Sequence, residues 1–556
     1  MTVLFGPDRH PTAETMTPGR SDTRAGSDSF GRVLHAEWTK FRTVRGWIIG
    51  LIVGVLVMVG LGLFVGGNVS IGCGTPNGPQ LSGKACLPYI PIGPGGEPVT
   101  DSFSFVHQPL AGNGSITTQV TSLTGQYQVG HGNGPVAAPG QGIPVSMASG
   151  TEPWAKAGIM VKASTHQGSA YAAMMVTGSH GVRMQYNYTG DIAGLPGKAS
   201  ASAPRWLRLT RSGDVLTGYD SADGSHWTRV GTVTLTGLPS TIAAGLFTTS
   251  PEHVTVDPFS RRGNSVLTPS QATGGFGHVG LADGWTSGRW AGTAIGAGNN
   301  ADYQVQSPGS ARSYTQTGGR FSVTGSGDIA PVVAGRGSGF PTYNINQLLV
   351  GVLGGLIAMI VVATMFMTAE YRRGLIRSTF AAAPRRGRVL AAKAIVAGLV
   401  TFVAGLIATL IAVPVGARLA ADKGEIVLPV SWLTEVQVVA GTAALLAVAA
   451  VLAVALGAIM RRSAAVVTTV IVAIMLPYFL CLTVLPEAAA DWVLRLTPAA
   501  AFAIQQSVTA YAQVNATYSP TNGYFPLAPL AGFAVLCAYA AAALVLASFL
   551  LNRRDA

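Results

Sequence analysis

The sequence predicts a multi-domain protein with a six-helix transmembrane domain and a large all-β extracytoplasmic domain, a sandwich of the jelly-roll type. Three observations predict this fold class. Only 11% of the 556 residues are charged. Six apolar stretches are each about long enough to cross a bilayer. A long polar insert without such a stretch separates the first two of them. The chain is therefore expected to be a multi-pass membrane protein.

The N-terminal part predicts a tail followed by a surface helix. Residues 1–29 are polar and lack the apolar core of a secretory signal, so we expect a disordered cytosolic tail. Residues 30–46 predict an amphipathic interfacial helix, because apolar side chains recur at helical spacing. A plain basic anchor before a span is the alternative. The apolar face is Phe30, Val33, Leu34, Trp38, Phe41 and Val44; the other face is Arg32, Glu37, Lys40, Arg42 and Arg45.

The six expected spans contain no clearly placed ionisable residue, so no ion-coupling apparatus is predicted. Basic residues gather in the short segments on one side of them, which places both termini in the cytoplasm and residues 67–344 outside it. This distribution explains the net charge of +12 without nucleic acid as a partner. Residues 486–525 are expected to form an extracytoplasmic re-entrant or interfacial segment, and 552–556 a cytosolic tail. The spans are 47–66, 345–367, 394–417, 437–460, 464–485 and 527–551.

The segment 368–393 is the densest basic stretch of the chain. We expect a cytosolic loop with a short helix over 374–382, ended by Pro384, that lies on the membrane surface. Glu370 is its only acid. Such a loop offers a cytosolic partner a rigid contact, and an ordinary orienting loop is the alternative. Its basic residues are Arg372, Arg373, Arg377, Arg385, Arg386, Arg388 and Lys393.

The polar insert predicts strands. Val182, Met184 and Tyr186 alternate with polar residues up to Tyr188, and residues 157–163 alternate in the same way, which is the period of half-buried strands. Turn signals at 212–214 and 221–224 separate these runs. We expect a sandwich over 101–259 and a further β segment over 261–343.

The four cysteines fall into two pairs of different kinds. Cys73 and Cys86 lie in a Gly/Pro-rich stretch after the first span and are a candidate disulfide in an oxidising compartment. Cys481 and Cys537 lie in apolar runs and are expected to be inert core thiols.

Catalysis by the insert is not expected. Glu97, Glu152 and Glu252 are its only glutamates, and each stands alone, whereas a retaining glycosidase needs two carboxylates close together. The histidines have no metal-binding spacing, so no metal site is predicted beyond a weak calcium candidate at Asp257. Gly197-Lys198-Ala199 fails as a phosphate loop, so the chain has no nucleotide site of its own.

The insert resembles the concanavalin-like, laminin-G-type sandwiches of lectins and glucanases. The resemblance rests on PWAKAGIMVKAS (153–164), SAYAAMMVT (169–177), the run 204–227 and AAGLF (243–247). It implies contact with a cell-envelope glycan. Aromatic side chains on strands are more often core, but five are candidates to stack on sugar rings. They are Trp154, Tyr171, Tyr186, Trp206 and Trp227.

The membrane part resembles actinobacterial type-2 ABC transporter permeases. LHAEWTKFRTVRGW (34–47), the segment 368–393 and the RRDA end carry this resemblance. It implies an exporter subunit in a bacterial plasma membrane, paired with a second permease copy as a homo- or heterodimer. ATP and Mg²⁺ would be bound by a separate ABC ATPase subunit, with no cofactor in this chain. The long insert departs from the family pattern and leaves the substrate open. The ATPase-contacting residues implied are Trp38, Lys40, Arg42, Glu370, Tyr371, Arg372, Arg373, Gly374 and Arg377.

Two other functions remain open from the sequence. The chain could be a membrane-anchored glycan-binding sensor whose spans only signal, or, with less support, a membrane-bound glycan hydrolase. A neighbouring ATPase gene would favour the transporter, and two facing carboxylates in a groove of the insert would favour the hydrolase.

Overall fold

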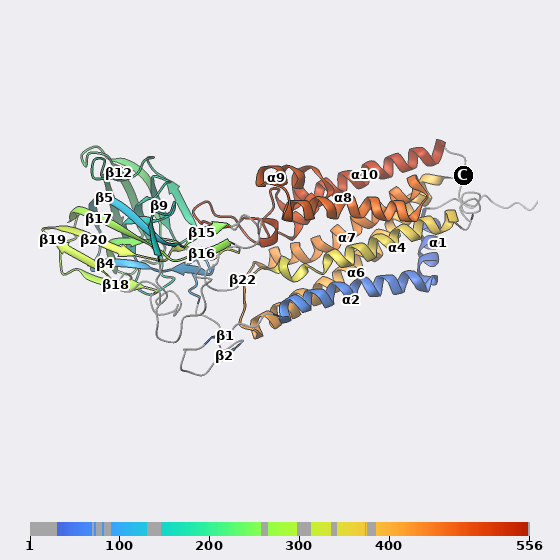
Figure 1. Cartoon of the computed structure of the whole chain (residues 1–556), viewed down its shortest axis with the longest axis horizontal. Helices are drawn as coiled ribbons and strands as arrows, with labels where there is room; N and C mark the ends of the chain where they lie inside the picture. Colours follow the sequence, from blue (N-terminus) through green and yellow to red (C-terminus); the bar gives the residue numbers. More distant parts are fainter. Residues whose placement is uncertain are drawn as a thin grey trace, which may run out of the picture.

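A computed structural model of the chain has two parts, a helical bundle and a β-sandwich at one end of it (Figure 1). The helix α1 and the C-terminal end of the last helix lie at the opposite end of the bundle. We call these two ends the sandwich end and the α1 end. The structure describes residues 30–68, 72–73, 81–82, 90–129, 146–256, 265–296, 313–334, 342–372, 374, 385–516 and 518–553.

The described part contains six helices that are long and apolar enough to cross a membrane, which confirms the predicted number. They share one apolar core, built largely from Leu, Val, Ile and Ala side chains. α6 contains Pro414 and α8 contains Pro477. The spans are α2 (Arg45–Asn68), α4 (Val352–Arg372), α6 (Arg386–Asp422), α7 (Trp432–Met460), α8 (Ser463–Thr483) and α10 (Pro529–Arg553).

The connection between α4 and α6 is shorter than predicted. α4 continues to Arg372 and α6 begins at Arg386, so Lys393 lies inside a membrane helix rather than in a loop. Gly374 lies in a turn with a φ of +68°, a conformation that glycine adopts without strain. Residues 375–384, and with them most of the predicted surface helix, lie outside the described residues.

The shorter helices lie at the two ends of the bundle. The amphipathic α1 (Phe30–Thr43) runs across the helices at the α1 end, as Figure 1 shows. At the sandwich end, the predicted re-entrant or interfacial segment contains a surface helix followed by a buried turn of helix. η3 is buried along its whole length, and it packs against α7, α8 and α10. The elements are η2 (Ile345–Leu349), α9 (Glu487–Leu496), η3 (Pro498–Gln505) and η4 (Pro520–Asn522).

The insert folds as two antiparallel sheets, as the alternating pattern predicts. The seven-stranded sheet has the order β10-β9-β8-β7-β14-β4-β18, and the eight-stranded sheet the order β13-β12-β11-β5-β17-β20-β19, with β6 paired to β5. The strands are β1 (Gly72–Cys73), β2 (Leu81–Ser82), β3 (Val99–Asp101), β4 (Phe103–Ala111), β5 (Gly114–Val129), β6 (Ser146–Ser149), β7 (Lys156–Lys162), β8 (Tyr171–Thr177), β9 (Val182–Tyr186), β10 (Gly190–Ala193), β11 (Arg205–Ser212), β12 (Val215–Ser221), β13 (Thr228–Thr234), β14 (Thr241–Thr249), β15 (His253–Val256), β16 (Ser265–Thr268), β17 (Ser270–Ala282), β18 (Ala291–Ile295), β19 (Tyr314–Thr317), β20 (Arg320–Gly325), β21 (Ile329–Pro331), β22 (Thr342–Tyr343) and β23 (Ile426–Val427).

The strands after residue 261 complete this sandwich rather than follow it. β17 pairs with β5 in the middle of the eight-stranded sheet, and β18 pairs with β4 at the edge of the seven-stranded one. The predicted division at residue 260 therefore does not separate two β segments. Long-range pairing of this kind leaves no local signal in the sequence.

The seven-stranded sheet is buried on both faces. One face packs on the eight-stranded sheet through residues such as Ile159 and Val161. The other carries Met160 and Lys162, which are also fully buried. The period-2 pattern of this strand predicted one exposed face, and that expectation is wrong. The covering element is the antiparallel pair of β3 and β21, through Val99 and Ile329.

The sandwich and the bundle are joined by backbone and side-chain contacts. β22, where the chain returns from the sandwich, pairs in parallel with β23 in the connection between α6 and α7. The Asn344 side chain donates to the backbone oxygen of Asn522 at 2.6 Å. The Gln513 side chain donates to the backbone oxygen of Thr189 in the sandwich at 3.0 Å. These contacts fix the sandwich to the segment that precedes α10.

Candidate functional site

Four charged side chains meet where α1 crosses the bundle; we call them the ion cluster. Lys393 of α6 donates to Glu37 of α1 at 2.7 Å and to Glu370 of α4 at 2.8 Å. Lys40 of α1 donates to the same two carboxylates at 2.7 and 3.0 Å. The cluster therefore ties one surface helix to two membrane helices.

Burial makes these interactions strong. Lys393 is fully buried, Glu37 is 2% exposed and Glu370 is 9% exposed, whereas the Lys40 side chain is 40% exposed. Two positive and two negative charges balance within the cluster, which offsets the large cost of removing each from water. Charge-assisted hydrogen bonds add geometric definition.

A group of aromatic side chains packs beside the cluster. Phe366 of α4 lies 5.3 Å from Phe41 and 5.2 Å from Trp47 between ring centroids, in edge-to-face arrangements. The Lys393 ammonium lies 4.5 Å from the centroid of the Phe366 ring, within the range of a cation–π interaction. The packing holds α1, the start of α2 and α4 in a fixed relation.

The structure brings together some of the predicted ATPase-contacting residues and leaves others apart. Glu370 and Lys40 meet in the ion cluster, while Trp38 and Arg42 lie on the exposed side of α1. Tyr371 instead lies 5.2 Å from the Arg461 guanidinium, at the end of α7. Gly374 is exposed. The Arg372 side chain, Arg373 and Arg377 lie outside the described residues.

Glu37 and Lys393 were not among the predicted site residues. The helical pattern placed Glu37 on the polar side of the first helix, yet Glu37 is buried and Trp38 is exposed. A signal was available, because Val33, Glu37 and Phe41 follow one another at intervals of four and therefore share a face. Lys393 was counted with the loop arginines. Its partner Glu37 lies 356 positions away, so no local pattern reveals the pair.

The aromatic residues predicted to contact a glycan do not form one platform. Tyr171 is fully buried and packs on Tyr188, so its ring faces no solvent, and Trp154 is buried under His180. Tyr186 on β9 belongs to the seven-stranded sheet. Two others belong to the eight-stranded sheet or its loops: Trp206 on β11, near His278, and Trp227, covered by the Arg208 guanidinium.

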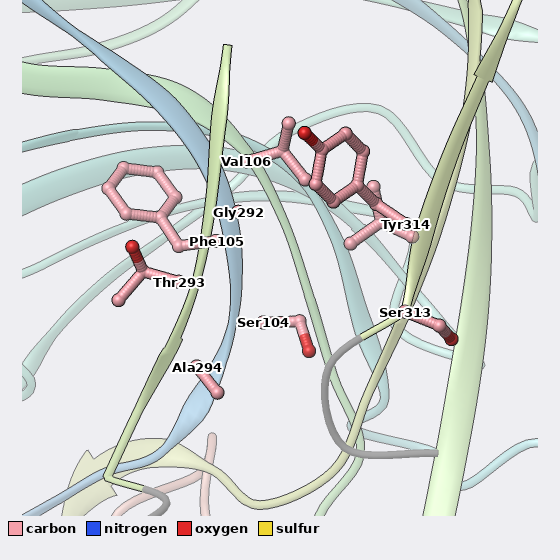
Figure 2. Close-up of a pocket in the computed structure, with 9 residues that line it drawn as sticks. Ser104, Phe105, Val106, Gly292, Thr293, Ala294, Ser313 and Tyr314 are labelled. Carbon is pink, nitrogen blue, oxygen red and sulfur yellow. The ribbon is translucent and has the colours of Figure 1, made fainter. Parts of the chain in front are cut away.

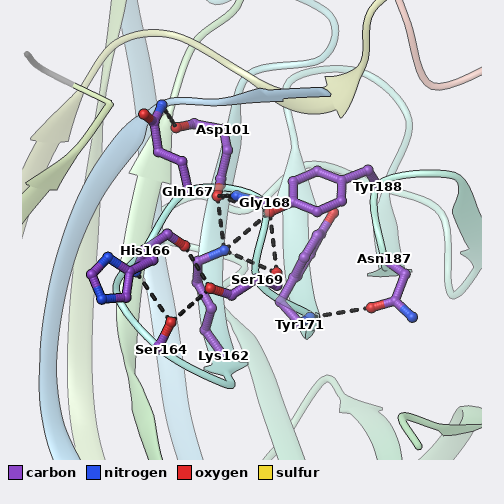
Figure 3. A network of polar contacts seen from close by, with 10 residues as sticks. All are labelled: Asp101, Lys162, Ser164, His166, Gln167, Gly168, Ser169, Tyr171, Asn187 and Tyr188. Carbon is purple, nitrogen blue, oxygen red and sulfur yellow. Dashed lines mark hydrogen bonds and ion pairs between the residues drawn. The ribbon is translucent and has the colours of Figure 1, made fainter. Parts of the chain in front are cut away.

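A polar network lies beside the buried Tyr171 (Figure 3). Lys162 donates to Asp101 of β3 at 2.8 Å and to the Ser169 carbonyl at 3.1 Å. The Tyr188 hydroxyl and the Gly168 amide donate to the same Asp101 carboxylate. Burial lowers the pKa of Lys162, and Asp101 opposes the shift. The network holds β3 on this face of the sheet, where it closes the surface to large ligands.

A cavity of about 270 Å³ lies between β18, the edge strand of the seven-stranded sheet, and β19, the edge strand of the eight-stranded sheet (Figure 2). Gly292 makes room for the Tyr314 ring, because a Cβ there would meet it. The Ser104 hydroxyl donates to the Thr324 carbonyl, and the Thr293 hydroxyl is hydrogen bonded to Nε2 of His107. The described lining residues therefore include hydroxyl side chains and two aromatic residues, Phe105 and Tyr314, and no carboxylate.

The remaining predicted sites lie largely outside the described part. Of the candidate disulfide, only the backbone of Cys73 is described, and Cys86 and the calcium candidate Asp257 are not. Among the described residues, no group of three or more His, Cys, Asp or Glu side chains is placed to hold a metal ion. Cys481 is buried, and Cys537 is partly buried.

Several solved structures resemble part of the chain. A functionally unknown protein from Saccharomyces cerevisiae has 14% identity and a TM-score of 0.19, over 38% of this chain and 83% of that one. Scytalido-glutamic peptidase with a peptide-based transition-state analogue has 8% identity and a TM-score of 0.23. A second structure of it, with a transition-state analogue inhibitor, has 9% and 0.25; each covers 42% of this chain and 100% of the peptidase. At these TM-scores the likeness supports no functional inference.

A search of curated proteins found no match. The family model described as ABC-2 family transporter protein matches residues 168–556. The match begins within the sandwich and includes the five spans from α4 to α10. The chain therefore belongs to the ABC-2 transporter family.

Proposed function

We propose that this chain is the permease subunit of an ABC exporter, driven by a separate ATPase subunit that binds ATP and Mg²⁺. The observation that carries the proposal is the ion cluster, together with membership of the family. A surface helix tied to two spans by buried charges transmits displacement better than one held by lipid contact alone. The permease acts with a second copy of a permease chain.

The α1 end faces the cytoplasm of a bacterial plasma membrane, and the sandwich lies outside. The basic side chains near the ends of the spans support this orientation. The basic residues at helix termini of the α1 end are Arg45 at the start of α2, Arg386 and Arg388 at the start of α6, Arg461 after α7 and Arg553 at the end of α10. Short loops rich in Lys and Arg remain on the cytoplasmic side.

Cysteine labelling tests this orientation. In a variant without the four native cysteines, Ser225→Cys places a thiol on an exposed turn of the sandwich, and Ala36→Cys places one on the exposed side of α1. We expect an impermeant maleimide to label the first in intact cells and the second only after the membrane is opened. Labelling of Ala36→Cys in intact cells would contradict the orientation.

Coupling runs from the ATPase surface through α1 into the spans. Trp38 and Arg42 are exposed on α1 and are available to a partner. Glu370 is not, because it is buried and Lys40 and Lys393 occupy one of its oxygens from within the chain. We therefore assign Glu370 a positioning role: it carries movement of α1 to α4 and α6 and does not itself touch the ATPase.

Glu370→Gln isolates this role, since glutamine keeps the size of the side chain and removes its charge. We expect the variant to insert and to retain its ATPase subunit in a pull-down. Substrate-stimulated ATP hydrolysis by the reconstituted complex should fall about tenfold, the size of one lost charge-assisted interaction. Glu435→Gln, an exposed acid in the first turn of α7, is the control. Normal stimulation in Glu370→Gln would reject coupling through the cluster.

The sandwich contacts a cell-envelope glycan or the exported substrate. The edge cavity supports this role better than the face closed by β3 and β21, because it combines hydroxyl groups with the Tyr314 ring. Sugars are bound by such combinations of hydrogen bonding and stacking. The concanavalin-like assignment of the sandwich belongs to the same proposal and is supported by its two antiparallel sheets.

A further inference from the structure

A second cavity, of about 120 Å³, lies at the joint between the sandwich and the bundle. We call it the joint cavity. Five separate parts of the chain form its walls, two of which are the stretch that begins at Pro331 of β21 and the single residue Tyr524. Glu97 and Pro98 come from the segment that enters the sandwich, and Leu428 comes from the connection after α6. Ser507 and Tyr511 come from the segment after η3. A ligand here would contact both domains at once.

Glu97 gives the cavity its charge. No lysine, arginine or histidine is among the described residues that line it. One Glu97 carboxylate oxygen and the Ser507 hydroxyl are buried without a hydrogen-bond partner in the described part of the chain. An unpartnered buried acceptor is costly, and a donor supplied from outside removes that cost.

The chain holds the Glu97 carboxylate in place. Gly93 and Gly95 leave the space that its two oxygens occupy, because a Cβ at either position would meet them. The turn is closed by the Gly93 amide, which donates to the Glu97 carbonyl at 2.7 Å. A tight glycine turn therefore positions the carboxylate, which has no cationic partner in the described part of the chain.

Two tyrosine rings form part of the wall. Tyr511 and Tyr524 line the cavity together with Pro98, Pro331 and Pro429. Glu97 and Tyr511 line the same cavity. Burial raises the pKa of Tyr511, and the nearby Glu97 charge raises it further. A carboxylate beside aromatic faces is the combination that recognises an organic ammonium group.

We infer that the joint cavity binds a small organic ammonium group. The volume corresponds to about four water molecules, which suits a head group of ethanolamine size. The ammonium would donate to Glu97 and Ser507 while its carbon atoms contact Tyr511. The source is either the head group of an aminophospholipid or a free amine. The inference goes beyond the proposed transport function and does not depend on it.

Ligand-observed NMR on the full-length chain in dodecyl maltoside tests the site, with ethanolamine as the probe and ethylene glycol as its neutral counterpart. We expect saturable binding of ethanolamine only. Glu97→Gln should weaken it at least tenfold, and Tyr511→Leu should weaken it without changing the charge. Glu435→Gln, an exposed acid at the same end of the bundle, should bind as the wild type does.

Two further results identify the source. If nanodiscs of phosphatidylethanolamine abolish the binding of added ethanolamine and nanodiscs of phosphatidylglycerol do not, the natural occupant is the lipid head group. Binding that persists in both indicates a free amine. The inference is overturned if ethanolamine does not bind saturably, if ethylene glycol binds equally, or if both Glu97→Gln and Tyr511→Leu retain wild-type affinity.

Discussion

Replacement of Lys393 by Met is expected to detach α1 from the bundle. The substitution keeps the length and apolar part of the side chain but leaves the Glu37 and Glu370 carboxylates with only Lys40 between them. Breaking a buried ion pair on one side costs about 3–5 kcal/mol, because the remaining charge stays out of water. The thermal unfolding midpoint in detergent should fall, and trypsin should cleave faster after the exposed Arg42.

Two further variants distinguish this effect from a general loss of packing. Lys423→Met makes the same change at the other end of α6, where the side chain is only partly buried, and should leave both measurements unchanged. Adding Glu370→Gln to Lys393→Met restores the charge balance, with Lys40 and Glu37 still paired. The double variant should therefore recover most of the lost stability. Equal damage in the single and double variants would argue that volume, not charge, holds α1.

Lowering the pH is expected to stabilise the joint between the sandwich and the bundle. Glu425, just after α6, is 1% exposed, and both of its carboxylate oxygens are shielded from solvent. Burial raises its pKa to about 7, and the neighbouring Tyr343 hydroxyl opposes the shift. The folded chain therefore holds a proton that the unfolded chain releases near pH 4.5.

The sign follows from proton linkage. Because the folded state binds the proton more tightly, the contribution of Glu425 to the free energy of unfolding is fully present below about pH 4.5. That contribution is lost as the pH rises through about 7. Glu425→Gln should remove this dependence and raise the unfolding midpoint at pH 8 by several degrees. Thermal unfolding from pH 4.5 to pH 8 measures both, with Glu435→Gln as the control. An unchanged pH profile in Glu425→Gln would assign the dependence to another group.

Much of the architecture follows from local patterns. Six spans were predictable because each is an uninterrupted apolar run, and the strands of the sandwich because their side chains alternate. Boundaries were less accurate. β9 ends at Tyr186 because Asn187 and Tyr188 adopt positive φ angles, which the alternating pattern up to Tyr188 does not reveal. The pairing of β17 with β5 likewise depends on contacts far apart in the chain.

The functional residues were predicted only in part. Glu370 and Lys40 were selected from a resemblance, and the structure places them in contact, yet the two residues that complete the cluster were not selected. Glu37 was predicted to lie on the polar face of its helix because it is an acid. Lys393 was predicted to lie in the cytosolic loop because it follows six arginines. A charged side chain is buried where an oppositely charged side chain pairs with it. When the two lie far apart in the sequence, the pair becomes apparent only from the arrangement of the helices in space.

The strand pair that covers the sandwich also determines how the domain is attached. Entry through β3 and exit through β21 are hydrogen-bonded neighbours, with Asp101 opposite Ile329 and Val99 opposite Pro331. The chain therefore enters and leaves the domain at adjacent positions, as it would in a hairpin inserted between α2 and α4. Closing so short a gap costs little chain entropy. A two-residue turn joining Val99 to Pro331 would therefore delete the sandwich and keep the connection between α2 and α4. Another domain with adjacent termini could be inserted at the same place.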